Sequence, residues 1–188
     1  MLTKTDGERL LMLARSTVKD YFNDGKLSIQ KTDFNEKQGV FVTLHDNKGG
    51  LRGCIGYPYP TFPLGEAVQR AAISAAFEDT RFRRLSSQEL GDILFEISVL
   101  TKPELIEVKR PEEYLKKIKI GTDGLIIEHG LNSGLLLPQV AIEHGFDAEE
   151  FLENTCWKAG LAPDMWSDMK TRIYKFQAQI FNERSPKH

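Results

Sequence analysis

The sequence predicts a two-lobed α+β fold, in which antiparallel sheets built from hairpins pack against helices. Two observations favour this class: the candidate strands come in hairpin pairs, and the helical patterns fall between those pairs. The length of 188 residues suits one domain or two small lobes. A doubly wound parallel sheet is disfavoured, because it needs a helix after nearly every strand.

The charge and composition exclude two broad classes of protein. The chain has 25 basic and 27 acidic residues, a formal net charge of −2, and 40% hydrophobic residues. Such a chain is not a uniformly basic nucleic-acid binder, although a local basic patch stays open. Its apolar content also argues against wholesale disorder.

The cysteines and the uncharged stretches indicate a cytoplasmic protein without a membrane segment. Cys54 and Cys156 are too few for a disulfide framework and form no CxxC pair. No signal peptide is visible at the start of the chain. The longest uncharged stretches, residues 53–65 and 130–142, are shorter than the roughly 18 apolar residues that span a bilayer.

The first part of the chain contains two predicted helices that flank a hairpin. Apolar residues recur at helical spacing over residues 6–22, where Asp6 is placed to cap the helix. Residues 40–45 alternate as a strand, and a second strand begins near Leu51 after a turn. Residues 64–78 form an alanine-rich helix whose small side chains permit close packing.

The remaining elements follow a similar pattern. Ser86 and Glu89 have capping-box spacing, which predicts a short helical turn. Residues 93–100 alternate as a strand, with Glu96 and Ser98 opposite its apolar face. The later elements are a short helix over residues 111–118, a hairpin of residues 125–128 and 135–137, helices over residues 138–145 and from Asp147 to Gly160, and a last strand over residues 172–181.

The most informative stretch is LRGCIG, residues 51–56, in the second strand of the first hairpin. Because side chains alternate in a strand, Arg52, Cys54 and Gly56 share one face. Matching the apolar faces of the two strands gives a predicted register with Leu44 opposite Leu51, Val42 opposite Gly53, Thr43 beside Arg52 and Phe41 beside Cys54.

Cys54 has two interpretations. The guanidinium of Arg52 favours a thiolate, which is the nucleophilic form, and strand glycines often mark the close approach of a ligand. Alternatively, Cys54 is a packed thiol, since free cysteine is among the most buried residue types, and the glycines only admit a helix. The exposure of this face distinguishes the two.

Nearly the whole chain resembles the AMMECR-one domain family. LRGCIG is similar to the family's signature, and GVFVTL precedes it. The blocks DTRFRRLSSQEL, FEISVLT, GLLLPQVA, FLENTCWKAGL and YKFQAQIF follow in the family's order. One departure is Thr80, where relatives usually carry proline in a D-P-R-F turn, and this loosens the loop before Arg81.

The resemblance implies a single two-lobed α+β domain over residues 1–181, with the signature near a cleft, followed by a polar tail at residues 182–188. It implies a cytoplasmic or nuclear protein. It also implies an association, in prokaryotes, with Memo-like and radical-SAM proteins, and a nucleic-acid or translation-related role has been suggested from the signature. It names no cofactor and no reaction.

We expect the interlobe cleft to bind a small anionic or modified-residue substrate. Arg52 would hold the anionic group, and Cys54 would act as a thiolate nucleophile or redox thiol. His45 and Glu96 are further catalytic candidates, because their strands present them beside that face. The ligand-binding candidates are Arg52, Gly53, Gly56, Arg81 and Gln139, the last at a helix start where an anion can bind.

The alternative function is a non-catalytic adaptor that binds protein or RNA through an arginine-rich rim. The competing interpretation of that rim is a network of ion pairs with Glu66, Glu78 and Asp79. A further possibility is a subunit that is active only with a Memo-like or radical-SAM partner. The rim arginines are Arg70, Arg81, Arg83 and Arg84.

Other motifs narrow the chemistry. His129 and His144 are fifteen positions apart with no nearby cysteine or second histidine, so the sequence proposes no metal site. Cys156 follows Leu152 at helical spacing and is expected to be a packed core thiol. No Walker A loop, GxGxxG or GxSxG motif is present, which weighs against ATPase, dinucleotide-dehydrogenase and α/β-hydrolase activities.

Overall fold

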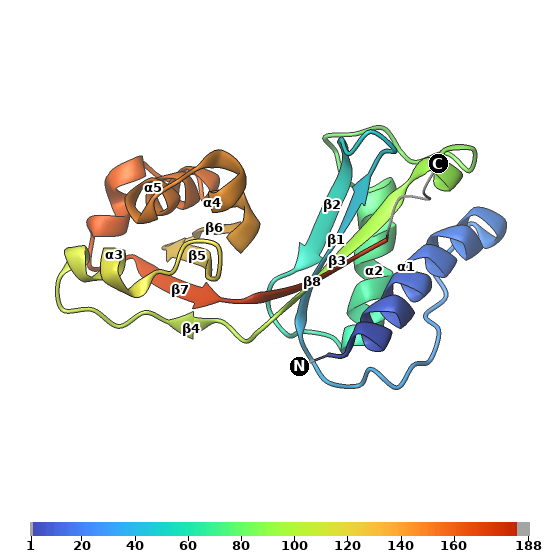
Figure 1. Ribbon diagram of the computed structural model, residues 1–188, viewed down its shortest axis with the longest axis horizontal. Coiled ribbons are helices and arrows are strands. Elements are labelled where there is room, and N and C mark those ends of the chain that lie inside the picture. Colours follow the sequence, from blue (N-terminus) through green and yellow to red (C-terminus); the bar gives the residue numbers. More distant parts are fainter. Residues whose placement is uncertain (1, 184–188) are drawn as a thin grey trace. The chain divides into compact units, whose positions relative to one another are not determined.

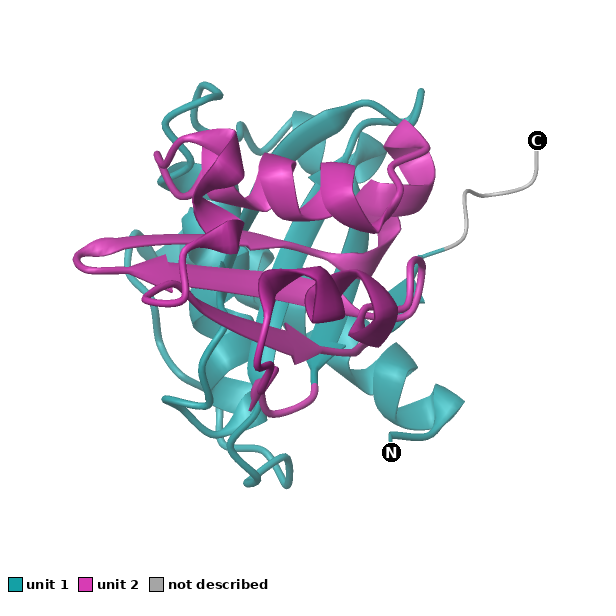
Figure 2. Ribbon diagram, turned by 90° about the vertical axis from the view of Figure 1, so that its left-hand side faces the viewer, with its two compact units in different colours: residues 1–100, 179–188 teal, residues 101–178 magenta. Residues whose placement is uncertain are grey.

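A computed structural model describes residues 2–183 of the chain. The chain divides into two compact units, coloured separately in Figure 2: unit 1 comprises residues 1–100 and 179–188, and unit 2 comprises residues 101–178. Each unit contains one four-stranded sheet and its own helices (Figure 1). The predicted α+β class is confirmed. Residues 184–188 of the predicted polar tail lie outside the described residues.

Unit 1 is built on a sheet with strand order β2-β1-β3-β8. One face of this sheet is covered by two helices: α2 packs against β1 and β2, and α1 packs against α2 and β3 (Figure 1). Its elements are α1 (Lys4–Asp24), β1 (Gly39–His45), β2 (Leu51–Tyr57), α2 (Leu64–Phe77), a 3-10 helix (Glu89–Asp92), β3 (Leu94–Leu100) and β8 (Ala178–Asn182).

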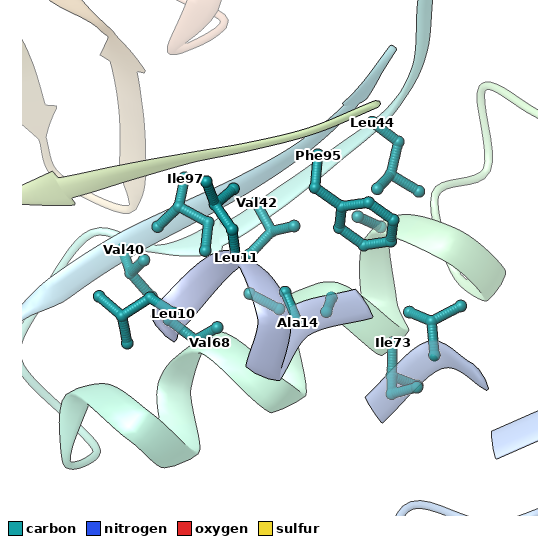
Figure 3. Close-up of a cluster of buried hydrophobic side chains, with 14 of the residues drawn as sticks. Leu10, Leu11, Ala14, Val40, Val42, Leu44, Val68, Ile73, Phe95 and Ile97 are labelled. Atoms are coloured by element: carbon teal, nitrogen blue, oxygen red, sulfur yellow. The ribbon is translucent and has the colours of Figure 1, made fainter. Parts of the chain in front are cut away.

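The core of unit 1 lies between this sheet and the two helices. Alternation along β1 directs Val40, Val42 and Leu44 toward the helices, where each side chain is fully buried. Full burial of one such side chain stabilises the fold by about 1.5–3 kcal/mol. The cluster drawn in Figure 3 also includes Leu10, Leu11, Ala14, Val68, Ile73, Phe95 and Ile97.

Helix α1 begins with a capping box. The hydroxyl of Thr3 accepts a hydrogen bond from the Asp6 N–H at 3.1 Å, and the Asp6 carboxylate accepts the Thr3 N–H at 2.8 Å. The prediction that Asp6 is the cap is therefore wrong: Thr3 is the cap, and Asp6 is its reciprocal partner. The helix ends at Asp24 and is capped by Gly25, whose φ of +67° favours glycine.

Helix α2 begins without a side-chain cap. Its first N–H groups instead donate to backbone carbonyls of the loop over residues 25–38. The fully buried Gln69 holds the same loop: its Oε1 accepts the Gln30 N–H at 2.7 Å, and its Nε2 donates to the Gln30 carbonyl at 3.0 Å. The loop and the helix therefore satisfy each other's backbone groups.

Unit 2 has a sheet with strand order β4-β7-β5-β6 and a separate core. Cys156 is fully buried in that core, as predicted, and burial raises the pKa of its thiol to about 11. The elements of unit 2 are β4 (Glu104–Leu105), a 3-10 helix (Pro111–Glu113), α3 (Tyr114–Lys117), β5 (Gly124–His129), β6 (Asn132–Leu136), α4 (Pro138–His144), α5 (Ala148–Lys158), a 3-10 helix (Pro163–Ser167) and β7 (Arg172–Phe176). No helix within residues 2–183 is both long enough and apolar enough to cross a bilayer.

The last predicted strand, residues 172–181, is two strands. β7 ends at Phe176 and β8 begins at Ala178, and the two belong to different sheets. Between them, the Gln177 carbonyl accepts the Thr101 N–H and the Gln177 N–H donates to Thr101 Oγ1, both at 2.9 Å. The sequence conceals this break, because no glycine or proline marks it.

Candidate functional site

We call the side of β1, β2 and β3 that points away from α1 and α2 the outer face. Strand alternation places most of the predicted site residues of unit 1 there. Gly53 lies on the helix side, Arg81 is in the loop after α2, and Arg52 is the residue of β2 that the bulge leaves without a cross-strand partner. The outer-face side chains used below are Phe41, Thr43, His45, Cys54, Glu96 and Ser98, with Gly56 beside them.

The register of the first hairpin differs from the predicted one by two residues. Cys54 lies opposite Thr43, whereas Phe41 had been expected there. A bulge between Leu44 and His45 accompanies this difference. From Gly53 onward the shift is even, so Gly53, Cys54 and Gly56 stay on their predicted faces, while the predicted cross-strand neighbours are wrong. Leu51 lies opposite His45 and so does not share the face of Gly53 as predicted.

The Cys54 thiol is half-buried and bonded to a hydroxyl. Thr43 Oγ1 lies 3.2 Å from Cys54 Sγ, at hydrogen-bond distance for sulfur. Burial raises the pKa of the Cys54 thiol, and it outweighs the Thr43 hydrogen bond and the charge of Arg81, which act in the opposite direction. At neutral pH the sulfur is therefore protonated, and a reaction at Cys54 needs a base.

Arg52 is bonded to the loop that follows α2. Its guanidinium contacts Glu89, with Nε 3.2 Å from Oε1, and donates to the carbonyl of Arg83 at 2.9 Å. Only 13% of the Arg52 side chain is exposed. Burial opposes ionisation of Glu89, but the Ser86 and Arg52 hydrogen bonds outweigh it and lower the pKa of Glu89 to about 2. Arg52 thus holds the loop over residues 83–89 against β2.

Asp79 and Arg81 close the open edge of β2, and we call this pair the edge clamp. β2 is the outermost strand of its sheet, so no neighbouring strand bonds the outward backbone groups of Cys54. The Asp79 carboxylate accepts the Cys54 N–H at 2.9 Å, and Arg81 Nη2 donates to the Cys54 carbonyl at 3.1 Å. Arg81 also binds Asp79 through Nε at 2.9 Å and Nη2 at 2.7 Å.

The edge clamp holds a carboxylate and a guanidinium beside the Cys54 backbone. The side-chain hydrogen bond from Arg81 lowers the pKa of the buried Asp79 from 3.8 to about 2, so the carboxylate is ionised at neutral pH. Half of the Arg81 side chain is nevertheless exposed. Arg81 therefore presents a guanidinium to solvent beside the Cys54 backbone.

The two predicted ligand-binding glycines have packing partners within unit 1. A Cβ atom at Gly53 would lie 2.2 Å from the Ala75 carbonyl oxygen of α2, and one at Gly56 would lie 2.5 Å from the ring of Phe41. Gly53 thus admits the helix, as the alternative interpretation of the glycines held. A ligand-binding role for either glycine stays a prediction.

His45, Glu96 and Ser98 lie on the outer face. His45 Nε2 is 3.9 Å from Glu96 Oε2. Thr43 lies opposite Glu96, so Cys54, Thr43 and Glu96 form one row across three strands. Ser98 is 1% exposed, and its Oγ has no hydrogen-bond partner within residues 2–183. Leaving a buried hydroxyl without a hydrogen-bond partner costs about 1–3 kcal/mol of stability. A hydroxyl in this position is typically completed by another group.

Gln139 lies in unit 2, in the first turn of α4. Its Oε1 is buried and has no hydrogen-bond partner in the part of the chain that the structure describes. Because it belongs to the other unit, its predicted role with Cys54 stays a prediction.

Neither a metal cluster nor the 720 Å³ hollow of unit 1 marks this site. Residues 2–183 contain no group of three or more histidine, cysteine, aspartate or glutamate side chains arranged to hold a metal ion. A hollow of about 720 Å³ in unit 1 lies between α1 and β8, and Cys54 does not line it. The outer face is therefore identified by its chemistry and not by its concavity.

The rim arginines are largely engaged in ion pairs or ring contacts. Arg70 Nε is 2.8 Å from Glu66 Oε1, and Arg83 Nη2 is 3.7 Å from Glu89 Oε1. Arg84 lies over the Phe77 ring, and Arg81 binds the carboxylate of the edge clamp. This arrangement resembles the predicted ion-pair network more than a continuous basic strip.

Sequence reasoning missed three contributors to the site. Thr43 was expected beside Arg52, so its contact with the thiol was not predicted. Asp79 was considered only as an ion-pair partner, and nothing local indicated that it accepts the Cys54 N–H 25 positions away. Alternation along the strand predicted the face of Ser98 correctly, but it did not predict that Ser98 is buried.

These features define a class of protein: a two-sheet α+β protein whose first sheet carries a thiol–hydroxyl–carboxylate row beside a clamped edge strand. The chain belongs to the AMMECR1 family, which it matches over residues 11–181. The resemblance seen in the sequence motifs is thereby confirmed.

Relatives of similar length share about half of its residues. A protein of Thermococcus onnurineus is 53% identical over 96% of this chain and 92% of its own length. Protein MJ0810 of Methanocaldococcus jannaschii is 50% identical over 100% of this chain and 94% of its own. The crystal structure of PH0010 from Pyrococcus horikoshii, described as an uncharacterized protein, matches with a TM-score of 0.91 and 51% identity, covering 96% of this chain and 92% of that one.

Proposed function

We propose that the outer face of unit 1 binds a small molecule or a modified amino-acid residue that carries an anionic group, with Cys54 as the nucleophile. The observation that carries this proposal is the meeting of three groups at one point of the edge strand. A half-buried thiol, a hydroxyl 3.2 Å from it and a half-exposed guanidinium that donates to its backbone all converge there. A nucleophile beside a cation suits an anionic electrophile.

Arg81 supports the anion-holding role better than Arg52. The guanidinium of Arg52 is mostly buried and bonded to Glu89 and to backbone carbonyls. Arg81 binds Asp79 and Cys54 through Nε and Nη2, and its Nη1 makes no hydrogen bond to residues 2–183. Its two Nη1–H groups are thus the donors that an anion beside Cys54 would meet.

Two alkylating agents of nearly equal size test this proposal. Iodoacetate carries a carboxylate and iodoacetamide does not; in both reactions the sulfur–carbon bond forms, the carbon–iodine bond breaks and iodide leaves with the electron pair. Relative to the unfolded chain in urea, folded protein should favour iodoacetate at Cys54 by roughly threefold, the effect of an exposed ion pair. Arg81→Gln should remove that preference, and Arg83→Gln, at an 82% exposed side chain, should keep it.

Cys156 is the internal reference for reactivity, because it is fully buried. Peptide mass spectrometry follows both cysteines in one sample. Cys54 that labels no faster than Cys156 in folded protein would exclude the nucleophile role. A ratio of iodoacetate to iodoacetamide equal to that of the unfolded chain would exclude the anion-holding role of Arg81.

A further inference from the structure

The row across the outer face places a hydroxyl between the strand positions of the Cys54 thiol and the Glu96 carboxylate. Thr43 stands between the two ends of the row, opposite Cys54 on β2 and opposite Glu96 on β3. Directly opposed side chains on antiparallel strands have Cβ atoms about 4.5–5.5 Å apart. Thr43 is 7% exposed, so water has little access to its hydroxyl.

We propose that Thr43 passes the proton of the Cys54 thiol to Glu96, which acts as the general base of the site. This inference rests on the proposed function, because it takes Cys54 as the reacting group. It adds Thr43 to the catalytic residues and gives Glu96 a defined role.

The transfer conserves protons and charge. The S–H proton of Cys54 moves to Thr43 Oγ1, while the hydroxyl proton of Thr43 moves to the Glu96 carboxylate. The products are a thiolate, a neutral Glu96 carboxyl group and a Thr43 hydroxyl that donates to the sulfur, which is the donor direction assigned to the 3.2 Å contact. The thiolate then attacks an electrophilic carbon, whose leaving group departs with its electron pair.

The other charged groups around Cys54 are poorly placed to accept this proton. Asp79, in the loop after α2, is held ionised by its bonds to Arg81 and to the Cys54 N–H, and it faces the backbone of Cys54. Arg52, on β2 itself, binds Glu89, and both arginines are cations without an acceptor.

On the other strands of this sheet, β1, β3 and β8, the titratable groups are His45 and Glu96. His45 Nε2 lies 3.9 Å from Glu96 Oε2, so the two side chains are neighbours on the outer face. Glu96 is close enough to Cys54 for its charge to raise the pKa of the thiol. A carboxylate near the thiol opposes a free thiolate, and it accepts the proton when the thiolate forms.

A second observation points to a ligand on the same face. Ser98 lies two residues along β3 from Glu96 and opposite Phe41, so it occupies the row next to that of Cys54. Its hydroxyl is buried and unpartnered within the described residues. A polar group of a bound ligand would satisfy this hydroxyl and sit one row from the thiol.

The pH dependence of labelling tests the relay in the full-length chain. Iodoacetamide labelling of Cys54 is followed between about pH 5 and pH 10 by peptide mass spectrometry. A thiol without a base loses about tenfold in rate for each pH unit below its pKa, because only the thiolate reacts. A relay adds a term that holds the rate on a plateau until Glu96 is protonated.

Three variants isolate the hydroxyl and the carboxylate. Thr43→Val keeps the shape and removes the hydroxyl, so it should lose the plateau and label about tenfold more slowly near pH 6. Thr43→Ser keeps the hydroxyl and should keep the plateau. Glu96→Gln should also lose the plateau, although removal of its charge moves the upper midpoint of the curve to lower pH. If Glu96 acts only through its charge, the wild-type curve has no plateau, and Glu96→Gln only shifts the upper midpoint.

The outcomes separate this inference from the proposed function. A wild-type profile that falls steadily with no plateau overturns the relay, while Cys54 remains the reactive group. An equal plateau in wild type and Thr43→Val also overturns it. Cys54 that is no more reactive than Cys156 at any pH overturns the proposed function itself. If Thr43→Val does not fold, Glu96→Gln alone carries the same expectation.

Discussion

The edge clamp makes a measurable contribution to the stability of unit 1, and Asp79→Asn tests it. Asp79 accepts hydrogen bonds from the Cys54 N–H and from the Arg81 side chain, and the Arg81 bond lowers its pKa from 3.8 to about 2. At about 1.4 kcal/mol per pKa unit, this lowering corresponds to about 2 kcal/mol. An amide keeps one acceptor oxygen and turns an NH₂ group toward a donor. The variant should therefore lose about 2–3 kcal/mol at pH 7.

This loss depends on pH in a defined direction. Because the pKa of Asp79 is lower in the folded protein than its ordinary value of 3.8, the stabilisation is fully present above about pH 5. It disappears as the pH falls from about 4 through about 2. The free energies of unfolding of wild type and variant should therefore converge in acid.

The assay has to report unit 1 separately from unit 2. Hydrogen exchange of peptides from β2, measured by mass spectrometry in increasing urea, follows unit 1 directly. Both tryptophans, Trp157 and Trp166, belong to unit 2, so their fluorescence is an internal reference. Asp92→Asn, in the exposed part of a 3-10 helix, is the matched control and should change stability by less than about 0.5 kcal/mol. Equal urea midpoints of β2 in wild type and Asp79→Asn at pH 7 would refute the reasoning, and so would a difference that persists undiminished at pH 2.5.

Three further substitutions test the packing around the site. Thr80→Pro should stabilise the protein by about 0.5–1 kcal/mol in urea unfolding, because position 80 is the second residue of a β-turn and its N–H bonds no described residue; a loss of stability would show that the turn rejects proline. Gly53→Ala should destabilise unit 1 by about 3 kcal/mol or more, because its Cβ would lie 2.2 Å from an α2 carbonyl, whereas Gly91→Ala, with open space around it, should cost under about 1 kcal/mol. Equal effects would contradict the packing. Gln69→Leu should cost about 2–4 kcal/mol by leaving the Gln30 backbone groups unbonded, and faster hydrogen exchange confined to residues 25–38 would support this cause, while unchanged exchange there would contradict it.

The faces of the first hairpin were predictable and its register was not. Alternation alone puts Cys54 on the face of Thr43, because the side-chain period of a strand is two. The register depends on the turn, where the Asp46 carboxylate accepts the N–H groups of Lys48 and Gly50, both at 2.8 Å, and on the bulge between Leu44 and His45. The sequence indicates a turn at these residues without fixing how many of them it contains.

The electrostatics of the site could not be read from neighbours in the chain. Arg52 is two residues from Cys54, which suggested a thiolate, but its guanidinium binds Glu89, 37 positions away. The cation that does approach Cys54 is Arg81, 27 positions away. Burial then decides the direction of the thiol's pKa, and burial depends on the whole fold.

Unit 2 is inserted between β3 and β8, so unit 1 is built from two separate segments of the chain. During synthesis, β3 has no β8 neighbour until the residues after unit 2 have been made. The Glu183 carboxylate then completes unit 1 by accepting the Phe95 N–H and binding Arg15. The chain leaves and re-enters unit 1 through the hydrogen-bonded pair of Thr101 and Gln177. Unit 1 with a short linker in place of unit 2 should therefore fold on its own and still carry the outer face with Cys54.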